Sequence, residues 1–280
     1  MSWVLLTLVY GLLKGGREIV KKESLKKSSI MEVLFFYTLF SFVMCIGVSQ
    51  DILLVDIKYL PVVFIKSFVI FLAWILSFKA IKQLPISIYG ILDLSRVLFA
   101  TLLGIIVMHE TCTIPQITGL ILVAAGLLLL KRRKSDVSED VKPLIVIFAL
   151  LSCMLNAVSG LLDKILTKHI TASQLQFYYM LFLTLLYLLY IIVTKEKVDI
   201  KGSVKNYWIW ILAIMFVIAD KSLFLANAYP ESRITIMTLV KQAGCIITIL
   251  AGKFIYKEKN MQHKFICAAI IILGIVVAVQ

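Results

Sequence analysis

The chain has 280 residues, of which 61% are hydrophobic and only 16% are charged, whereas ordinary soluble domains carry about 25% charged residues. Together with a mean hydropathy of +0.99, this composition excludes a soluble enzyme or nucleic-acid-binding domain and indicates a polytopic membrane protein. We attribute the net charge of +13 to lysines and arginines in the loops, because basic residues concentrate in the loops of membrane proteins.

A helix needs about 20 apolar residues to cross a bilayer, and the sequence holds about ten such stretches. We predict an all-α membrane protein of about ten transmembrane helices. The predicted spans are Ser2–Val20, Ile30–Ser49, Leu60–Ile81, Ile86–Met108, Ile114–Leu130, Pro143–Leu166, Ser173–Val193, Tyr207–Ala228, Arg233–Ile255 and Lys264–Val279. The first span lacks the basic segment and the A-x-A pattern of a signal peptide, so we expect it to be retained.

The fourth predicted span carries Asp93 and Arg96 near its middle. A charged side chain at bilayer depth costs about 3 kcal/mol on insertion scales, and such residues normally face a protein interior or a water-filled path. Positions three and four apart share a helix face. Tyr89, Asp93 and Arg96 therefore form one stripe, and we predict an ion pair between Asp93 and Arg96. A purely structural clamp is the alternative interpretation.

The two halves of the chain resemble each other. FFYTLF at Phe35–Phe40 recurs as FYYMLF at Phe177–Phe182, 142 residues later. About five spans per half is an odd number, so the second half must enter the membrane in the opposite sense, as in many secondary transporters. The sequence predicts two inverted five-helix repeats. Their predicted bounds are 1–131 and 143–280, with a charged loop at 132–142.

The same repeat aligns two polar stripes within otherwise apolar spans. In the sixth span the stripe is Ser152, Asn156, Ser159 and Asp163, and in the first span it is Tyr10, Lys14, Arg17 and Lys21. A second offset, of 148 residues, aligns Asp93 with Lys241. Lys66 and Asp220 add charges to two further spans. Lys164 and Lys221 are also intramembrane by position, but a long side chain can snorkel to the interface, so their role stays open.

The repeated end of each half resembles the drug/metabolite transporter superfamily, in particular its ten-helix EamA branch, over essentially the whole chain. Glu110 and Glu258 match the family's acidic residue at the end of the fourth and ninth helices. Gly126 and Gly274 match its late glycine in the fifth and tenth helices. The proline that the family often has early in the fourth and ninth helices is missing here, near Val97 and Cys245. The resemblance implies a small-molecule carrier whose central cavity is lined by the first, third, fourth, sixth, eighth and ninth helices.

Other function classes have weaker support. The sequence has no H-E-x-x-H, G-x-S-x-G or P-loop motif, so we predict no enzyme, although a membrane-embedded transferase remains an alternative. The five cysteines are scattered without histidine partners, which predicts neither a disulfide framework nor a metal site,. We expect no cofactor and no nucleic-acid partner. The expected partners are the lipid bilayer, a small-molecule substrate and protons as a candidate coupling ion, with a monomer or homodimer in the plasma membrane.

The charges within the spans suggest an anionic substrate, moved by alternating access. Seven lysines and arginines oppose four carboxylates there, and an anionic group would complete the pairing. An amino acid or another carboxylate- or phosphate-bearing metabolite fits this balance, whereas Glu18 in the first span favours the alternative of a multidrug or cation exporter. The predicted substrate-binding residues are Lys14, Lys66, Trp74, Tyr89, Arg96, Asn156 and Lys241. The predicted coupling network is Asp93, Asp163 and Asp220.

The loop charges predict an orientation, because basic residues in short loops tend to stay cytoplasmic. Eighteen lysines and arginines lie in or beside the loops after odd-numbered spans, whereas Lys58, Lys168 and Arg233 lie on the other side. We therefore expect both termini outside the cytoplasm, although the family resemblance implies cytoplasmic termini.

A reporter fused after Gln280 tests this orientation. We expect periplasmic phosphatase activity from the fusion, and strong cytoplasmic fluorescence without phosphatase activity would contradict the prediction.

Overall fold

The computed structural model describes residues 2–46, 54–109, 113–132, 142–258 and 261–279, all of whose regular elements are helices. In the first half, a short 3-10 turn, η2 (Ile57–Tyr59), precedes the third helix. The helices of this half are α1 (Ser2–Ser24), α2 (Ile30–Ile46), α3 (Leu60–Gln83), α4 (Ile86–Asp93), α5 (Arg96–Met108) and α6 (Ile114–Arg132). Residues 133–141 of the predicted charged loop lie outside the described residues.

The second half follows the same order with one additional helix. Its helices are α7 (Pro143–Leu166), α8 (Ala172–Thr194), α9 (Ile200–Lys205), α10 (Tyr207–Ala228), α11 (Ile234–Lys241), α12 (Gly244–Phe254) and α13 (Met261–Val279). The bounds of α7 and α10 are those predicted. The short helix α9 is not predicted, because its six residues lie in a polar connection between two spans. Its start is capped by Asp199, whose side chain accepts a hydrogen bond from the Gly202 N–H.

Local signals explain where several helices begin. Proline stands in the first turn of α3 and of α7, where the missing N–H would have no helical partner. At the start of α8, Thr171 and Gln174 form a reciprocal capping box. The side chain of Asn206 accepts from the Trp208 N–H at the start of α10. These caps satisfy N–H groups that the first helical turn leaves free.

Five helical segments of the described residues are long and apolar enough to cross a membrane. They are Ile57–Gln83, Ile86–Val107, Pro143–Leu166, Ala172–Thr194 and Tyr207–Ala228. Helices α2, α6, α12 and α13 supply shorter apolar segments. Helix α1 is long, but it carries Lys14, Arg17, Glu18 and Lys21 in its middle and second half.

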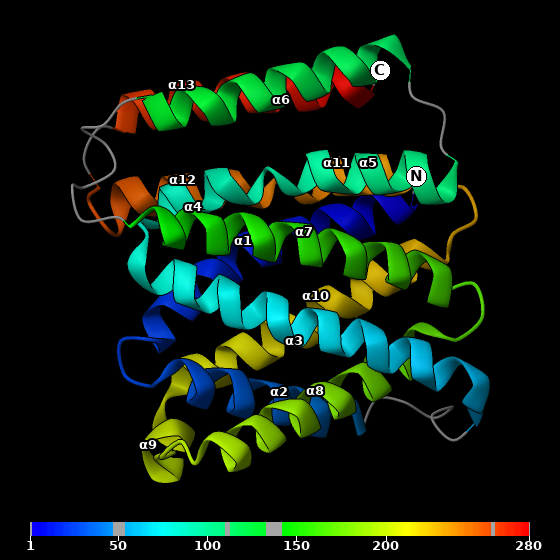
Figure 1. The fold of residues 1–280 in the computed structure, drawn as a ribbon, viewed down its shortest axis with the longest axis vertical. Coiled ribbons are helices and arrows are strands. Elements are labelled where there is room, and N and C mark those ends of the chain that lie inside the picture. The colour runs from blue at the N-terminus through cyan, green and yellow to red at the C-terminus, as the bar shows by residue number, and fades with distance from the viewer. Residues whose placement is uncertain (1, 47–53, 110–112, 133–141, 259–260, 280) are drawn as a thin grey trace.

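The packing of the helices follows the inverted repeat. Helix α1 of the first half packs along α10 of the second, and α7 of the second half packs along α3 of the first. At the edges of the bundle, equivalent helices pair with each other, α2 with α8 and α6 with α13 (Figure 1). The predicted all-α fold with two inverted five-helix repeats is thus the fold of this protein.

The fourth and ninth predicted spans are each interrupted near the middle. Helix α4 ends at Asp93 and α5 begins at Arg96, while α11 ends at Lys241 and α12 begins at Gly244. At both breaks the chain makes tight i→i−3 hydrogen bonds, such as Ser95 N–H to the Leu92 carbonyl at 3.0 Å. The breaks occur without the family's proline. They also divide each span, so that α4 packs against α12 and α5 packs against α11.

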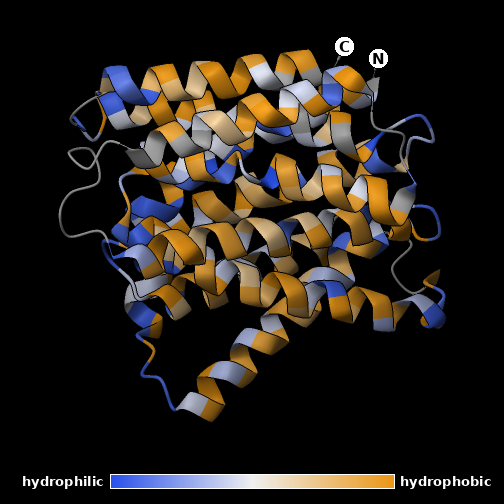
Figure 2. Ribbon diagram, turned by 45° about the horizontal axis from the view of Figure 1, so that its top comes forward, coloured by the Kyte–Doolittle hydropathy of each residue, from blue (hydrophilic) through white to orange (hydrophobic). Residues whose placement is uncertain are grey.

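The bundle has two polar faces. One, on the left in Figure 1, holds the C-terminal ends of α1, α3, α8 and α12, and we call it the basic-loop face because the basic loops lie there. Both ends of the chain lie towards the opposite face, which we call the terminal face. Figure 2 shows hydrophobic residues along the helices and hydrophilic residues gathered at their ends, as a bilayer requires,.

Helices α1 and α12 touch backbone to backbone. A Cβ added to Gly15 would lie 2.8 Å from the Cα of Gly244, closer than real Cβ contacts. Only glycine therefore permits this crossing of the two halves. A Cβ at Gly160, in contrast, would meet nothing within 4 Å.

We expect Gly15→Ala to destabilise the folded protein by about 1–3 kcal/mol, because overpacking forces the backbones apart. Its melting temperature in detergent should fall by several degrees. The matched variant Gly160→Ala adds the same methyl group to open space and should melt at or above the temperature of the unmodified protein. Equal melting temperatures for the two variants would contradict this account of the crossing.

Candidate functional site

A cavity of about 70 Å³ lies between the two halves. It has room for several water molecules or a small polar ligand, since one water needs roughly 10–15 Å³ on this measure. Its walls come mainly from α1, α3, α5, α7, α10 and α11, with one tyrosine each from α2 and α8. Its charged lining residues are Lys14, Arg17, Glu18, Lys21, Lys66, Arg96, Asp163, Asp220 and Lys241.

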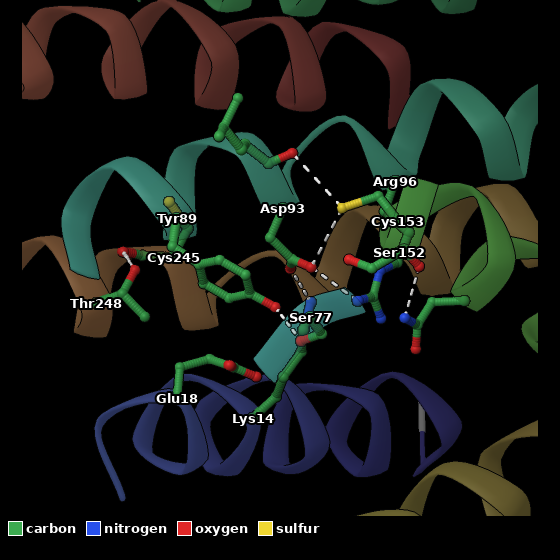
Figure 3. Close-up of polar contacts among 12 residues, drawn as sticks. Lys14, Glu18, Ser77, Tyr89, Asp93, Arg96, Ser152, Cys153, Cys245 and Thr248 are labelled. Carbon is green, nitrogen blue, oxygen red and sulfur yellow. Dashed lines mark hydrogen bonds and ion pairs between the residues drawn. The ribbon is translucent and has the colours of Figure 1, made fainter. Parts of the chain in front are cut away.

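Asp93 ends α4 at the inner edge of this cavity and is shared by two cations (Figure 3). Its Oδ2 pairs with the ammonium of Lys14 from α1, and its Oδ1 lies 2.7 Å from Nη2 of Arg96 at the start of α5. The predicted Asp93–Arg96 ion pair is present. Cys153 of α7 contacts the same carboxylate, with Sγ 3.8 Å from Oδ1. Asp93 therefore joins four helices at the first break.

Two further ion pairs cross between the halves. Arg17 of α1 lies 3.2 Å from Asp220 of α10, and Lys66 of α3 lies 3.2 Å from Asp163 of α7. Both cations also face aromatic rings, with Lys66 Nζ 3.3 Å from the ring centre of Tyr179. Since the side chain of Lys66 is only 1% exposed, its charge is compensated by protein groups rather than by solvent.

Lys241 differs from the other cations of the cavity. Within the described residues it forms no ion pair or hydrogen bond, and its ammonium lies 5.6 Å from the ring centre of Tyr10. It is 9% exposed. The Nε atoms of Arg17 and Arg96 also lack hydrogen-bond partners among the described residues. The cavity thus presents one ammonium group without an ion pair or hydrogen bond among the described residues, and two N–H donors without a partner there.

One carboxylate oxygen is also unpaired. Oε2 of Glu18 has no hydrogen-bond partner among the described residues, whereas Oδ1 of Asp163 is the oxygen that lies 3.2 Å from Lys66. The other oxygen of Glu18 lies 2.8 Å from Lys21, so its charge is balanced within α1. Counting Asp93, six cations face four carboxylates at the cavity, and the local excess is positive.

Most of the predicted site residues meet at this cavity. The predicted residues that line it are Lys14, Lys66, Trp74, Arg96, Asn156, Asp163, Asp220 and Lys241. Asp93 lies beside it through Lys14 and Arg96. Tyr89 does not line it: its hydroxyl is 2.6 Å from that of Ser77, and α4 is buried against its neighbours. The break after Asp93 directs α5 towards the cavity and leaves Tyr89 on α4. The role of Tyr89 in substrate binding has no support from this cavity and stays a prediction.

Two intramembrane lysines lie away from the cavity. Lys164 donates to the carbonyls of Asn227, at 3.1 Å, and Tyr229, at 3.0 Å, and to the hydroxyl of Ser232. Lys164 therefore supplies hydrogen-bond donors to carbonyl groups at the C-terminal end of α10. Lys221 donates to the hydroxyl of Ser173. The predicted excess of intramembrane cations counted both lysines, and neither adds to the charge of the cavity.

The sequence reasoning missed two tyrosines that line the cavity. Tyr37 of α2 and Tyr179 of α8 are both almost fully buried there. They occupy the same position in the recurring motif, FFYTLF and FYYMLF, 142 residues apart. A tyrosine retained at one intramembrane position of both halves was the signal that could have identified them.

Some sequence predictions concern residues for which the structure gives no description. Glu110 and Cys112 lie outside the described residues. The described cysteines, Cys45, Cys153, Cys245 and Cys267, are buried, and none of them forms a disulfide with another described residue. Among the described residues, no three His, Cys, Asp or Glu side chains gather as a metal ion would require.

Comparison with known proteins gives a consistent result. A family model described as the EamA-like transporter family matches residues 1–132 and 143–280. No curated protein matches the sequence. A solved crystal structure superposes with a TM-score of 0.71 at 16% sequence identity, covering 99% of this chain and 96% of that chain. At this identity the likeness shows the fold alone.

Proposed function

The chain belongs to the EamA-like transporter family, and from that membership we propose that it carries a small anionic metabolite across the membrane by alternating access. The substrate class is a carboxylate- or phosphate-bearing compound, amino acids included. The binding residues are Lys14, Lys66, Trp74, Arg96, Asn156 and Lys241. The site of action is the plasma membrane, and the working unit is a monomer or a homodimer.

The observation that carries this proposal is the unpaired ammonium of Lys241. An uncompensated charge in a low-dielectric site is costly, so buried cations normally have a partner. The neighbouring cations Lys14 and Arg96 already share Asp93. An anionic group of the substrate would supply the missing partner. The free Nε atoms of Arg17 and Arg96 offer it further hydrogen bonds.

The alternative of a cation exporter has less support. It depends on Glu18 as a free acidic group, and Glu18 is paired with Lys21 at 2.8 Å. A membrane-embedded transferase would need an acid and a base clustered near one interface. Here the charged groups instead come from both halves around a central cavity.

The broken helices support alternating access. Each half contributes one break, and the four half-helices pack as the pairs α4–α12 and α5–α11. Each pair joins the two halves, one nearer the basic-loop face and one nearer the terminal face. Rocking of the halves would open one pair while closing the other, which is the motion common to inverted-repeat carriers.

We expect the purified protein to be stabilised against heat by anionic metabolites. A ligand at 100 times its dissociation constant adds about 2.7 kcal/mol of stability. A thermal-shift screen should compare dicarboxylates, phosphate esters, amino acids and quaternary amines. Lys241→Ala should abolish the stabilisation, whereas Lys253→Ala, on the exposed surface of α12, should retain it. Stabilisation by amines alone, unaffected by Lys241→Ala, would overturn the anion proposal.

We also expect transport to respond to protons, because Asp93, Asp163 and Asp220 are buried carboxylates next to the substrate cavity. Protonation of Asp220 would release Arg17 from its ion pair. In proteoliposomes loaded with a substrate found by the screen, an imposed pH gradient should accelerate transport. Asp220→Asn should remove this acceleration. Transport by the unmodified protein that is indifferent to the gradient would exclude proton coupling in favour of a facilitator or exchanger.

A further inference from the structure

Glu258 follows α12 in the second half, yet its carboxylate holds the start of α4 in the first half. Its Oε1 accepts the N–H of Ile86 at 2.7 Å and that of Ser87 at 3.4 Å. Its Oε2 accepts the hydroxyl of Ser87 and the ammonium of Lys264, at 3.0 Å. One carboxylate thus satisfies two N–H groups that the first turn of a helix leaves free, and it does so across the repeat boundary.

This cluster is buried. Ile86 and Ser87 are fully buried, and the side chains of Lys264 and Glu258 are 2% and 10% exposed. Water therefore has little access to replace the carboxylate when its contacts break. Hydrogen bonds that involve a charged group are roughly twice as strong as neutral ones.

The cluster lies where α4 and α12 pack most closely. A Cβ added to Gly252 of α12 would be 3.0 Å from Cβ of Ser87, and one added to Gly90 of α4 would strike the side chain of Thr248. Among the described residues, neither α4 nor α12 lines the cavity, whereas α5 and α11 do. The close packing of α4 against α12 therefore leaves no passage between these two helices from the cavity to the basic-loop face.

Two other contacts tie the same face together. The hydroxyl of Tyr256 donates to Oε1 of Glu23 at 2.7 Å, which links the end of α1 to the segment after α12. Lys22 donates to the carbonyl of Leu84 at the end of α3. Neither contact touches α4. Among the described residues, Glu258 is the side chain that bonds the segment after α12 to the start of α4.

We propose that Glu258 is a positioning residue that latches the basic-loop face closed, by capping α4 of the opposite half, and that opening towards this face requires the cap to break. This inference rests on the alternating-access part of the proposed function. It does not depend on which substrate is carried. In this latch Glu258 has two partners, Ser87 and Lys264. The breaks after Asp93 and Lys241 let α4 and α12 move independently of α5 and α11.

Cys245 is a native reporter for this opening. It lies in the first turn of α12, is 6% exposed, and borders a small space between α1, α4 and α12. A second reporter, Gly160→Cys, would place a thiol on the cavity wall in open space. In each reporter variant all other cysteines are changed to alanine, so that the protein carries a single thiol. Reaction with sulfonatoethyl methanethiosulfonate, which does not cross membranes, is then timed from each side of sealed vesicles.

The latch variants are Glu258→Gln and Ser87→Ala, with Glu196→Gln, an exposed residue after α8, as the matched control. We expect Glu258→Gln to raise the rate at Cys245 from the basic-loop face by about tenfold or more, as the loss of one charged hydrogen bond implies. Ser87→Ala should give a smaller rise, and Glu196→Gln no change. The rate at Gly160→Cys from the terminal face should fall when the latch is removed.

Unchanged rates at Cys245 in both latch variants would overturn the latch. Rates that rise together at both reporters would also overturn it, because they would mean general loosening. Ser87→Ala keeps the Glu258–Lys264 pair, so it remains informative if Glu258→Gln fails to fold. No substrate is present in this assay. Opposite responses of the two reporters would therefore support the latch even if the anion proposal fails, and a failed latch leaves the thermal-shift result intact.

Discussion

The structure depends on ion pairs that compensate charges placed at bilayer depth. Arg17–Asp220 and Lys66–Asp163 each take one partner from each half, so neither half can bury its charges without the other. Removing one member of such a pair leaves an uncompensated buried charge and typically costs about 3–5 kcal/mol. Lys241 differs from these four residues, because it forms no ion pair among the described residues and its ammonium instead lies 5.6 Å from the ring centre of Tyr10.

The glycine contacts and the ion pairs join different pairs of helices across the two halves. Gly15 and Gly244 bring α1 and α12 into backbone contact, while the paired side chains hold α1 and α7 against α10 and α3. Lysines at equivalent positions, Lys22 and Lys164, satisfy the C-terminal carbonyls of α3 and α10, respectively. These two contacts tie α1 to the end of α3 in the first half and α7 to the end of α10 in the second.

Much of this architecture can be predicted from sequence because the bilayer limits the possibilities. Apolar length places the spans, and the offset between Phe35–Phe40 and Phe177–Phe182 identifies the repeat. The charged site residues could be identified because charge is rare within spans. The breaks could not, because no proline marks them and they depend on packing between α4 and α12. The position of Tyr89 could not be predicted for the same reason: on a continuous helix it would share a face with Arg96, whereas the break leaves it on α4, outside the cavity lining.

The two helix breaks end in opposite charges, Asp93 in the first half and Lys241 in the second, at equivalent positions 148 residues apart. Two identical halves assembled as a dimer would bring together either two carboxylates or two ammonium groups at the centre of the bundle. Only a chain in which the halves are encoded separately can place one of each there. The duplication therefore did more than build a symmetric frame. It allowed one repeated position to differ between the two copies, and a centre of mixed charge could arise inside a symmetric scaffold.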